Sequence, residues 1–392
     1  MTDPRELDVV LVGGTGFTGR LTATYLARRA PAGLKWALAG RTLSKLEALR
    51  ARLAEIEPAL ADLELIRVDA DDATALAALA ERTKVVITAV GPYLAHGGPL
   101  LAACAAAGTD YVDLTGEPEF VDRMYVTHHK TAVASGARIV HACGFDSVPH
   151  DLGAYFAVQQ LPDDRPITLR GVARATGGVS GGTFHSLLNA ASRLGEMRSA
   201  VRARAAVEAA PTGRRSVAVT GKPHHDPVTG YWLLPAPAID QAIVGRSGAA
   251  LASYGPDFRY SHYLGMKHLP VLVGAGFGVG AVLAAAQVRP VRNLLLSRVP
   301  QGSGPSDKTR AAATFTVDFV GNAGGQQVHT RVSGVDPYDV SGVTLAESAL
   351  SLALDDNPEC AGQVTTAQAM GDHLMARLQA AGMRFEVVGS SA

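Results

Sequence analysis

The chain has 392 residues and 47% of them are apolar, which exceeds the usual size of one hydrophobic core and predicts two or more domains. Its 36 basic and 36 acidic residues cancel, so no overall field favours nucleic acid as a partner. The 3 cysteines lack the spacing of a disulfide framework or a zinc site, and no metal is predicted. The N-terminal MTDPRELD has no apolar run with a cleavage site, so a cytoplasmic location is expected.

Up to about residue 150, short strands alternate with helical segments that are rich in Ala and Leu. Each strand is apolar almost throughout, which is typical of strands buried on both faces of a parallel sheet. The six segments are LDVVLVG (7–13), LKWALAGR (34–41), LELIRVDA (63–70), KVVITAVG (84–91), DYVDLTG (110–116) and ARIVHACG (137–144). Residues 1–150 are therefore predicted to form an α/β domain around a doubly wound parallel sheet, the Rossmann arrangement.

The stretch VVLVGGTGFTGR (9–20) joins the first strand to the first helix and contains three glycines at a spacing of three. Glycine allows the tight turn and lets backbone amides at the start of a helix approach a pyrophosphate. An ordinary glycine turn is the alternative, but the order strand, loop, helix favours a dinucleotide site. The predicted cofactor-binding residues of this loop are Gly13, Thr15, Gly16, Phe17, Thr18 and Gly19.

Arg41 ends the second strand about 20 residues further on, where an NAD-specific site has Asp or Glu against the ribose 2′-hydroxyl. A guanidinium can bind a 2′-phosphate through paired donors, and Lys45, one helical turn later, adds positive charge. The pattern favours NADP over NAD, with a solvated surface arginine as the alternative. Asp69, at the end of the third strand, is predicted either to face the adenine or to cap a helix.

Ligands of a doubly wound sheet bind beyond the carboxyl ends of its strands. Strands four, five and six end in VGPYLAHGG (90–98), DLTGEPE (113–119) and HACGFDSVPHD (141–151). Gly91 and Pro92 are predicted to form a turn beside the nicotinamide ribose, and Tyr93 follows them. The polar and thiol residues expected to gather at the domain border are His141, Cys143, Asp146, Ser147 and His150.

After residue 150 the regular alternation stops. The segments ATFTVDFVG and QQVHTRVSG flank the turn NAGG and predict an antiparallel hairpin. Residues 151–362 are therefore predicted to form a second, substrate-binding α+β domain with an antiparallel sheet, and 363–392 a helix and strand that pack back on the body. GGVSGGTFHSLL (177–188) is either a loop that closes on substrate, with Ser180, Thr183 and His185, or a plain helix entry.

Residues 258–306 contain no acidic residue and five basic ones. Within them, VLVGAGFGVGAVLAAA (271–286) has 16 apolar residues, fewer than the ~20 that span a bilayer. A core helix with solvated arginines is one interpretation. The other is an interfacial segment that contacts a lipid surface, on the inner membrane face, or an acidic carrier protein.

Several motifs in a fixed order, covering nearly the whole chain, carry a resemblance to a known family. They include GGTGFTGR (13–20), AGRTLSKLE (39–47), HACGFDSVPHDLG (141–153) and GGVSGGT (177–183). The sequence resembles the saccharopine dehydrogenase-like oxidoreductases, and within them the actinobacterial trans-acting enoyl reductases. This resemblance implies that the chain uses NADPH to reduce an enoyl thioester in polyketide-type lipid synthesis. It also implies a partner, a synthase whose acyl carrier domain holds the substrate.

The implied reaction delivers hydride to Cβ of the thioester, stabilises an enolate oxygen and protonates Cα. Tyr93 and His141 are the predicted donors for the last two steps, with Ser147 as a further donor. Each position also has a structural interpretation. Tyr93 would stack on the nicotinamide, His141 would be a core histidine, and Asp146 would cap the helix that follows.

Two other functions stay open from the sequence. A dehydrogenase that reduces an imine, as saccharopine reductase does, would need arginines for the substrate carboxylates, and Arg170 and Arg174 are the obvious pair. A protein that binds NADPH and docks on lipid without turnover is the other alternative. The acyl chain, the carrier and the oligomeric state, a dimer included, are left open.

Overall fold

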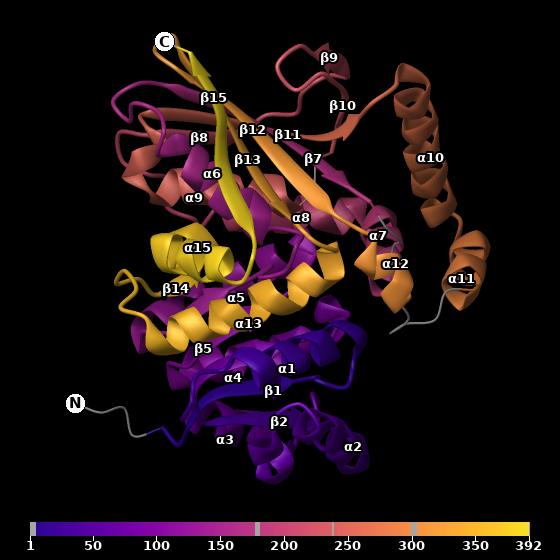
Figure 1. The fold of residues 1–392 in the computed structure, drawn as a ribbon, viewed down its shortest axis with the longest axis vertical. Coiled ribbons are helices and arrows are strands. Elements are labelled where there is room, and N and C mark those ends of the chain that lie inside the picture. Colours follow the sequence, from indigo (N-terminus) through magenta and orange to yellow (C-terminus); the bar gives the residue numbers. More distant parts are fainter. Residues whose placement is uncertain (1–4, 177–180, 237–238, 299–303, 392) are drawn as a thin grey trace. The chain divides into compact units, whose positions relative to one another are not determined.

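The computed structural model describes residues 5–176, 181–236, 239–298 and 304–391 (Figure 1). The chain divides into two compact units. One comprises Met1–Phe145 and Tyr338–Ala381, and the other Asp146–Pro337 and Gly382–Ala392. Residues 338–362, which the sequence-based division places in the second domain, fall in the first unit here.

The first unit is built on a parallel sheet of seven strands in the order β14-β6-β5-β4-β1-β2-β3. The strands are β1 (Leu7–Val12), β2 (Trp36–Gly40), β3 (Glu64–Arg67), β4 (Thr83–Thr88), β5 (Asp110–Asp113), β6 (Arg138–Val140) and β14 (Gly362–Val364). Val9, Val10 and Leu11 of the central strand are fully buried, as their apolar run predicts. The Rossmann arrangement is confirmed. The sequence missed β14, because three residues are too few to show a pattern.

Helices of the first unit connect these strands, and their ends follow ordinary capping rules. They are α1 (Phe17–Arg29), α2 (Leu43–Ala54), η1 (Pro58–Asp62), α3 (Ala73–Glu81), α4 (Tyr93–Ala107), α5 (Pro118–Ser135), α13 (Pro337–Leu354), α14 (Thr366–Ala369) and α15 (Gly371–Ala380). Helices α4 and α5 end at Gly108 and Gly136, which adopt the left-handed conformation that glycine allows. These glycines therefore end α4 just before β5 begins and α5 just before β6 begins.

The second unit contains a mixed sheet of eight strands in the order β15-β13-β12-β7-β11-β10-β9, with β8 paired to β11. They are β7 (Ile167–Ala175), β8 (Arg215–Ala218), β9 (His224–Asp226), β10 (Tyr231–Pro235), β11 (Asp257–Met266), β12 (Phe315–Ala323), β13 (Gln326–Gly334) and β15 (Arg384–Ser391). The predicted hairpin is β12–β13, with Gly324 and Gly325 at positive φ in its turn. The α+β prediction is confirmed. The sheet is mixed, because β7 and β8 run parallel to β11.

Helices of the second unit lie around this sheet. They are α6 (Val148–Val158), α7 (Gly181–Ser192), α8 (Leu194–Ala205), α9 (Ile239–Ala250), η2 (Ala252–Tyr254), α10 (Leu269–Gln287), α11 (Arg289–Arg298) and α12 (Asp307–Ala311). Helix α6 packs on β12, β13 and α9, and α9 also packs on β11. Gly153 makes the close approach of α6 to the sheet feasible, because a Cβ there would lie 2.3 Å from the Phe319 ring.

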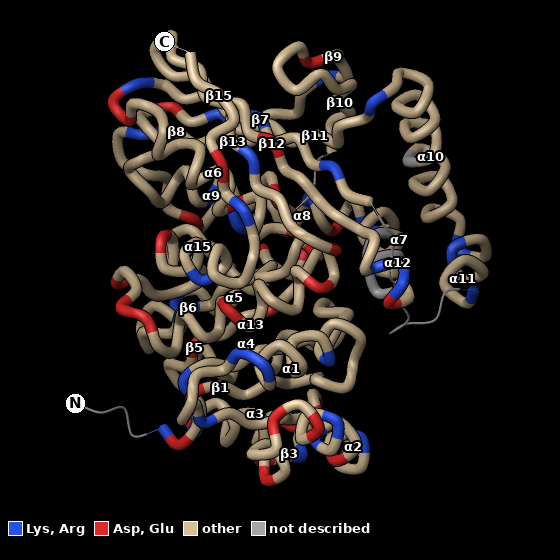
Figure 2. The backbone as a smooth tube through the Cα atoms, in the orientation of Figure 1, with Lys and Arg blue, Asp and Glu red and all other residues tan. Residues whose placement is uncertain are grey.

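Helix α10 is apolar and mostly exposed. It has 19 residues, and its most apolar window has a mean hydropathy of 2.0 with 12% of that window buried, so by length and composition it could cross a membrane. A core helix does not fit these values, and Phe277 alone is 78% exposed. Figure 2 shows no charged residue along α10, whereas arginines mark α11, which follows it. Residues 299–303 of the predicted basic stretch lie outside the described residues.

Candidate functional site

The loop between β1 and α1 has the close backbone packing that a dinucleotide site requires. Gly13 has a φ of +85°, and its amide donates to the carbonyl of Ala39 at the end of β2 (3.1 Å). A Cβ at Gly19 would lie 2.2 Å from the Gly13 carbonyl oxygen, so no side chain fits there. Gly16 is the N-cap of α1 and no side chain caps this end of the helix, which suits a phosphate.

The other predicted residues of this loop are half-buried beside the glycines. Thr15 accepts a hydrogen bond from Arg20 through its carbonyl (2.8 Å), which fixes the loop against α1. The ring of Phe17 meets that of Tyr338 edge to face, with centroids 5.6 Å apart. Thr18 lies in the first turn of α1.

Arg41 directly follows β2, and Lys45 lies in the first turn of α2. Both side chains are exposed, and neither has a hydrogen bond or ion pair with another described residue. Since Gly13 is bonded to the end of β2, Arg41 lies beside the glycine loop. Asp69 forms a turn with Asp71 (3.3 Å), and the cap of α3 is Asp72 instead. An anionic group held by the N-terminus of α1 and a guanidinium fits these residues.

Gly91 and Pro92 lead from β4 into α4 through a cis peptide bond. Tyr93 is 5% exposed, and its hydroxyl donates to the carbonyl of Thr88 (3.0 Å), so the side chain holds the end of β4. Its amide donates to Oε1 of Glu117 (3.0 Å), which therefore caps α4 from the next loop. Burial raises the pKa of the Tyr93 hydroxyl well above its usual value and also raises the pKa of Glu117.

His141 and Asp113 form a buried pair at the carboxyl ends of β6 and β5. Nδ1 of His141 lies 2.7 Å from Oδ2 of Asp113, and the carboxylate also accepts from the Tyr111 hydroxyl (3.1 Å) and the Ala142 amide (2.9 Å). Ala142 adopts a φ of +57°, a strained conformation for a residue with a side chain. When Nδ1 donates to Asp113, Nε2 carries the lone pair, and no described residue hydrogen-bonds to Nε2. A carboxylate that orients a histidine in this way is typical of an acid–base site.

Ser147 is the N-cap residue of α6, although its side chain makes no capping bond. Its hydroxyl instead donates to Oδ1 of Asp240 on α9 (3.1 Å), and both residues are buried. The interpretation of Asp146 as the helix cap is wrong, since Ser147 has that position.

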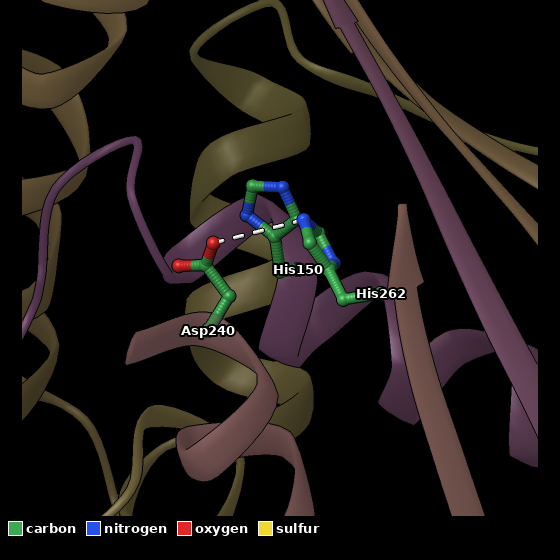
Figure 3. A group of neighbouring side chains, drawn as sticks. All are labelled: His150, Asp240 and His262. Atoms are coloured by element: carbon green, nitrogen blue, oxygen red, sulfur yellow. Dashed lines mark ion pairs between the residues drawn. The ribbon is translucent and has the colours of Figure 1, made fainter. Parts of the chain in front are cut away.

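Three side chains from three elements converge beside Ser147 in the second unit (Figure 3). They are His150 of α6, Asp240 of α9 and His262 of β11, and all are buried. Nε2 of His262 lies 3.8 Å from Oδ2 of Asp240, and the two histidine rings meet at 67° with centroids 4.9 Å apart. Burial raises the pKa of Asp240 well above its usual value, assisted by the charge of Asp146, and lowers the pKa of His262 to about 4.

The structure brings part of the predicted site together. A Cβ on Gly13 would lie 2.6 Å from the Val90 side chain, so the glycine loop is next to the turn at Gly91 and Pro92. Ser147 and His150 lie together in the second unit, as do Tyr93 and His141 in the first. Of the loop at 177–188, Ser180 and the side chain of Thr183 lie outside the described residues, and His185 is half-buried in α7.

Sequence reasoning missed four polar residues of these sites: Asp113, Glu117, Asp240 and His262. Asp113 and Glu117 stand in DLTGEPE, at the end of a predicted strand, and that position was a usable signal. Asp240 and His262 gave none, because they are distant in sequence from each other and from α6.

Arg170 and Arg174 on β7 are each bound to a carboxylate. Arg170 pairs with Asp226 (2.7 Å), and Arg174 with Asp318 (2.6 Å). Arg174 also donates to the Tyr231 hydroxyl (2.6 Å). Their charges are therefore compensated within the protein.

Comparison with known proteins agrees with this geometry. Residues 9–140 match the saccharopine dehydrogenase NADP-binding domain family. A trans-acting enoyl reductase of Mycobacterium leprae is 36% identical, with 99% of both chains covered, and one of Mycobacterium tuberculosis is 37% identical, with 97% of both covered. The saccharopine dehydrogenase (L-Glu forming) structure from Saccharomyces cerevisiae has a TM-score of 0.57 at 14% identity, covering 98% of this chain and 100% of that one, and it shares the fold.

The fold and the NADP-binding domain define an NADP-dependent oxidoreductase. Full-length similarity then places the chain more narrowly. It belongs to the trans-acting enoyl reductase family, within the saccharopine dehydrogenase-like oxidoreductases.

Proposed function

We propose that the protein reduces the double bond of an enoyl thioester with NADPH, in trans with a polyketide-type synthase whose acyl carrier domain holds the substrate. The observation that carries this proposal is the similarity, over 97% or more of the chain, to proteins named trans-acting enoyl reductases. Those names imply work on behalf of a separate synthase.

The glycine loop and the end of β2 support the choice of cofactor. The glycines at 13, 16 and 19 would let the pyrophosphate approach the N-terminus of α1, which no side chain caps, and Arg41 with Lys45 would hold the 2′-phosphate. Gly91 and Pro92 would border the nicotinamide ribose. When bound, the reduced nicotinamide supplies the hydride that Cβ receives.

His141 is the residue that we propose to carry the proton for Cα. Asp113 fixes its ring through Nδ1, and Nε2 has no partner among the described residues, so the imidazolium form would give its Nε2 proton to Cα and return to the neutral ring. Tyr93 and Ser147 stay proposed donors for the enolate oxygen. Each hydroxyl already donates, to Thr88 and Asp240 respectively, so each would have to exchange that partner for substrate.

The imine-reducing alternative loses its support. Its substrate carries carboxylates that need available arginines, and Arg170 and Arg174 are already paired with buried carboxylates.

We further propose that α10 and α11 contact an anionic lipid surface on the inner membrane face, where the acyl substrate would be found. The apolar side chains of α10 are exposed, and α11 presents Arg289, Arg292 and Arg298 beside exposed Leu294. An apolar segment next to cationic residues binds lipid headgroups and the outer acyl region together.

A substrate panel tests the proposed reaction. The purified chain is mixed with NADPH and enoyl thioesters, with the matched saturated thioesters as the control, and the nicotinamide absorbance is followed while mass spectrometry detects the product. We expect NADPH oxidation and a saturated thioester only with the enoyl substrates. Oxidation with saccharopine-like imines alone would overturn the proposal, and no oxidation with either class would favour a non-catalytic NADPH-binding protein.

A further inference from the structure

The geometry points to a metal site in the second unit: we propose that His150, Asp240 and His262 bind one Zn²⁺ ion. The three residues come from α6, α9 and β11, and α9 packs on both of the other elements (Figure 3). This inference shares only Ser147 with the proposed reduction, because the hydroxyl of Ser147 also donates to Asp240, and neither the glycine loop nor the His141 pair takes part in it.

The ligand atoms have the separation of a site that closes on a metal. One ligand atom from each residue lies within 4.8 Å of the other two, and Oδ2 of Asp240 is 3.8 Å from Nε2 of His262. Zn–N and Zn–O bonds of about 2.0–2.1 Å bring tetrahedral ligands to about 3.3 Å from one another. Side-chain rotations that move each ligand atom by a few tenths of an ångström to about one ångström would bring the three atoms to these distances.

Direct hydrogen bonding does not explain the arrangement of the Asp240–His262 pair. A separation of 3.8 Å is beyond a hydrogen bond, yet the two atoms face each other inside the protein. Asp240 is 7% exposed, and among the described residues no lysine or arginine pairs with its carboxylate. A divalent cation in this place would compensate the charge of the ionised carboxylate inside the protein.

Hydroxyl groups hold the far atoms of two of these ligands. The Ser147 hydroxyl donates to Oδ1 of Asp240 (3.1 Å), which leaves Oδ2 for a metal. Nδ1 of His262 lies 3.1 Å from the Tyr260 hydroxyl, and when Nδ1 donates to that oxygen, the lone pair on Nε2 faces the cluster. Metal-binding histidines and carboxylates are characteristically oriented by such outer hydrogen bonds.

The ligand types select the metal. Two imidazoles and one carboxylate suit late first-row divalent ions, and Zn²⁺ is bound by two histidines and a carboxylate in catalytic zinc sites. Three protein ligands leave one position of a tetrahedral site for water or another small ligand.

Zinc content and zinc affinity test the site. The full-length protein is stripped with a chelator, exposed to Zn²⁺ alone and dialysed, and metal is measured by plasma mass spectrometry. Affinity is measured by competition with a chromophoric chelator, and Co²⁺ substitution reports four-coordinate geometry through its visible spectrum. We expect one Zn²⁺ per chain.

The variants D240N and H262Q should each raise the Kd for Zn²⁺ by at least ~100-fold, and Tyr260→Phe by about 10- to 100-fold, because it frees the imidazole. His225→Gln is the matched control, since His225 is an exposed histidine on β9 of the same unit and its loss should leave the Kd unchanged. Circular dichroism and NADPH binding show that each variant is folded, and Tyr260→Phe keeps every ligand should the others fail to fold.

Two results would overturn the inference. One is a wild-type protein that retains no stoichiometric zinc. The other is zinc that D240N, H262Q and Tyr260→Phe bind as tightly as the wild type does. The zinc test measures metal content and the reductase test measures NADPH oxidation. A negative result in one test therefore does not contradict the proposal that the other examines.

Discussion

Arg41 is the residue that we propose to set the choice of NADPH over NADH. It stands where the second strand ends, exposed and without a partner among the described residues, beside a glycine loop that leads into an N-terminus of α1 that no side chain caps. A guanidinium in that place forms paired, charge-assisted hydrogen bonds only when the cofactor carries a 2′-phosphate. The chain therefore has a cation where NAD-specific relatives of the fold have an acid.

Replacing Arg41 with alanine is expected to raise the Kd for NADPH by about 10- to 100-fold and to leave the Kd for NADH nearly unchanged. Hydrogen bonds to a charged group contribute about 1.5–3 kcal/mol, and about 1.4 kcal/mol corresponds to a tenfold change. Fluorescence titration with both cofactors measures the effect. Arg52→Ala, an exposed arginine in the last turn of α2, is the control. Equal losses for both cofactors would contradict the assignment.

Asp113 is a positioning residue for His141, so Asp113→Asn should lower kcat by about 100-fold while the Kd for NADPH changes little. The amide no longer fixes the ring with Nδ1 as donor. Steady-state kinetics with an enoyl thioester, together with cofactor titration, separate the two effects. Tyr111→Phe removes one hydrogen bond to the same carboxylate but keeps its charge, and we expect a much smaller loss. A wild-type kcat in Asp113→Asn would exclude His141 as the proton carrier.

At the scale of elements, a carboxylate joins three neighbouring strands of the second sheet. Asp318 on β12 is fully buried and accepts hydrogen bonds from Arg174 on β7 (2.6 Å) and Arg331 on β13 (2.8 Å), with His329 Nε2 at 2.9 Å. Burial raises the pKa of Asp318, but the hydrogen bonds from His329, Arg174 and Arg331 outweigh it and lower the pKa to about 2. The charged form of Asp318 therefore stabilises the fold.

The stabilisation by Asp318 should depend on pH in a defined window. Its pKa falls from 3.8 in the unfolded chain to about 2 in the fold, so the contribution is fully present above about pH 4 and is lost as the pH falls through 2. A shift of this size corresponds to about 2–3 kcal/mol. Urea unfolding of the wild type and of Asp318→Asn measures it. The difference in unfolding free energy should shrink between pH 4 and pH 2, and a constant difference would show that the charge of Asp318 is not responsible.

The exposed apolar side chains of helix α10 predict that it contacts lipid. The double variant V273D/F277D should reduce sedimentation with vesicles that contain phosphatidylglycerol by at least about tenfold, because each charge opposes insertion of the helix. Val201→Asp, on α8 of the same unit and about as exposed as Val273 in the wild type, is the control and should bind normally. Binding to the variant at the wild-type level would instead favour a protein partner, such as an acidic carrier domain.

At the scale of the whole molecule, the chain crosses between its two units more than once. Helix α15 belongs to the first unit, whereas β15, only a few residues later, pairs with β13 in the second. The sequence predicted a helix and a strand here that pack back on the body, but local patterns carry no record of which sheet a strand joins. An edge strand such as β15, with most residues exposed, has little apolar patterning to reveal its partner.

The sequence by itself determined the Rossmann strands, the dinucleotide loop and the place of Arg41. These depend on local chemistry: continuous apolar runs fill a parallel sheet, glycines adopt a φ closed to other residues, and strand and helix follow within one short segment. Only the tertiary structure decided that Asp113 orients His141, that Arg170 and Arg174 are paired, and that His150, Asp240 and His262 meet. Each of these depends on a distance between residues remote in the chain, which folding sets through the packing of strands and helices and which no single segment encodes.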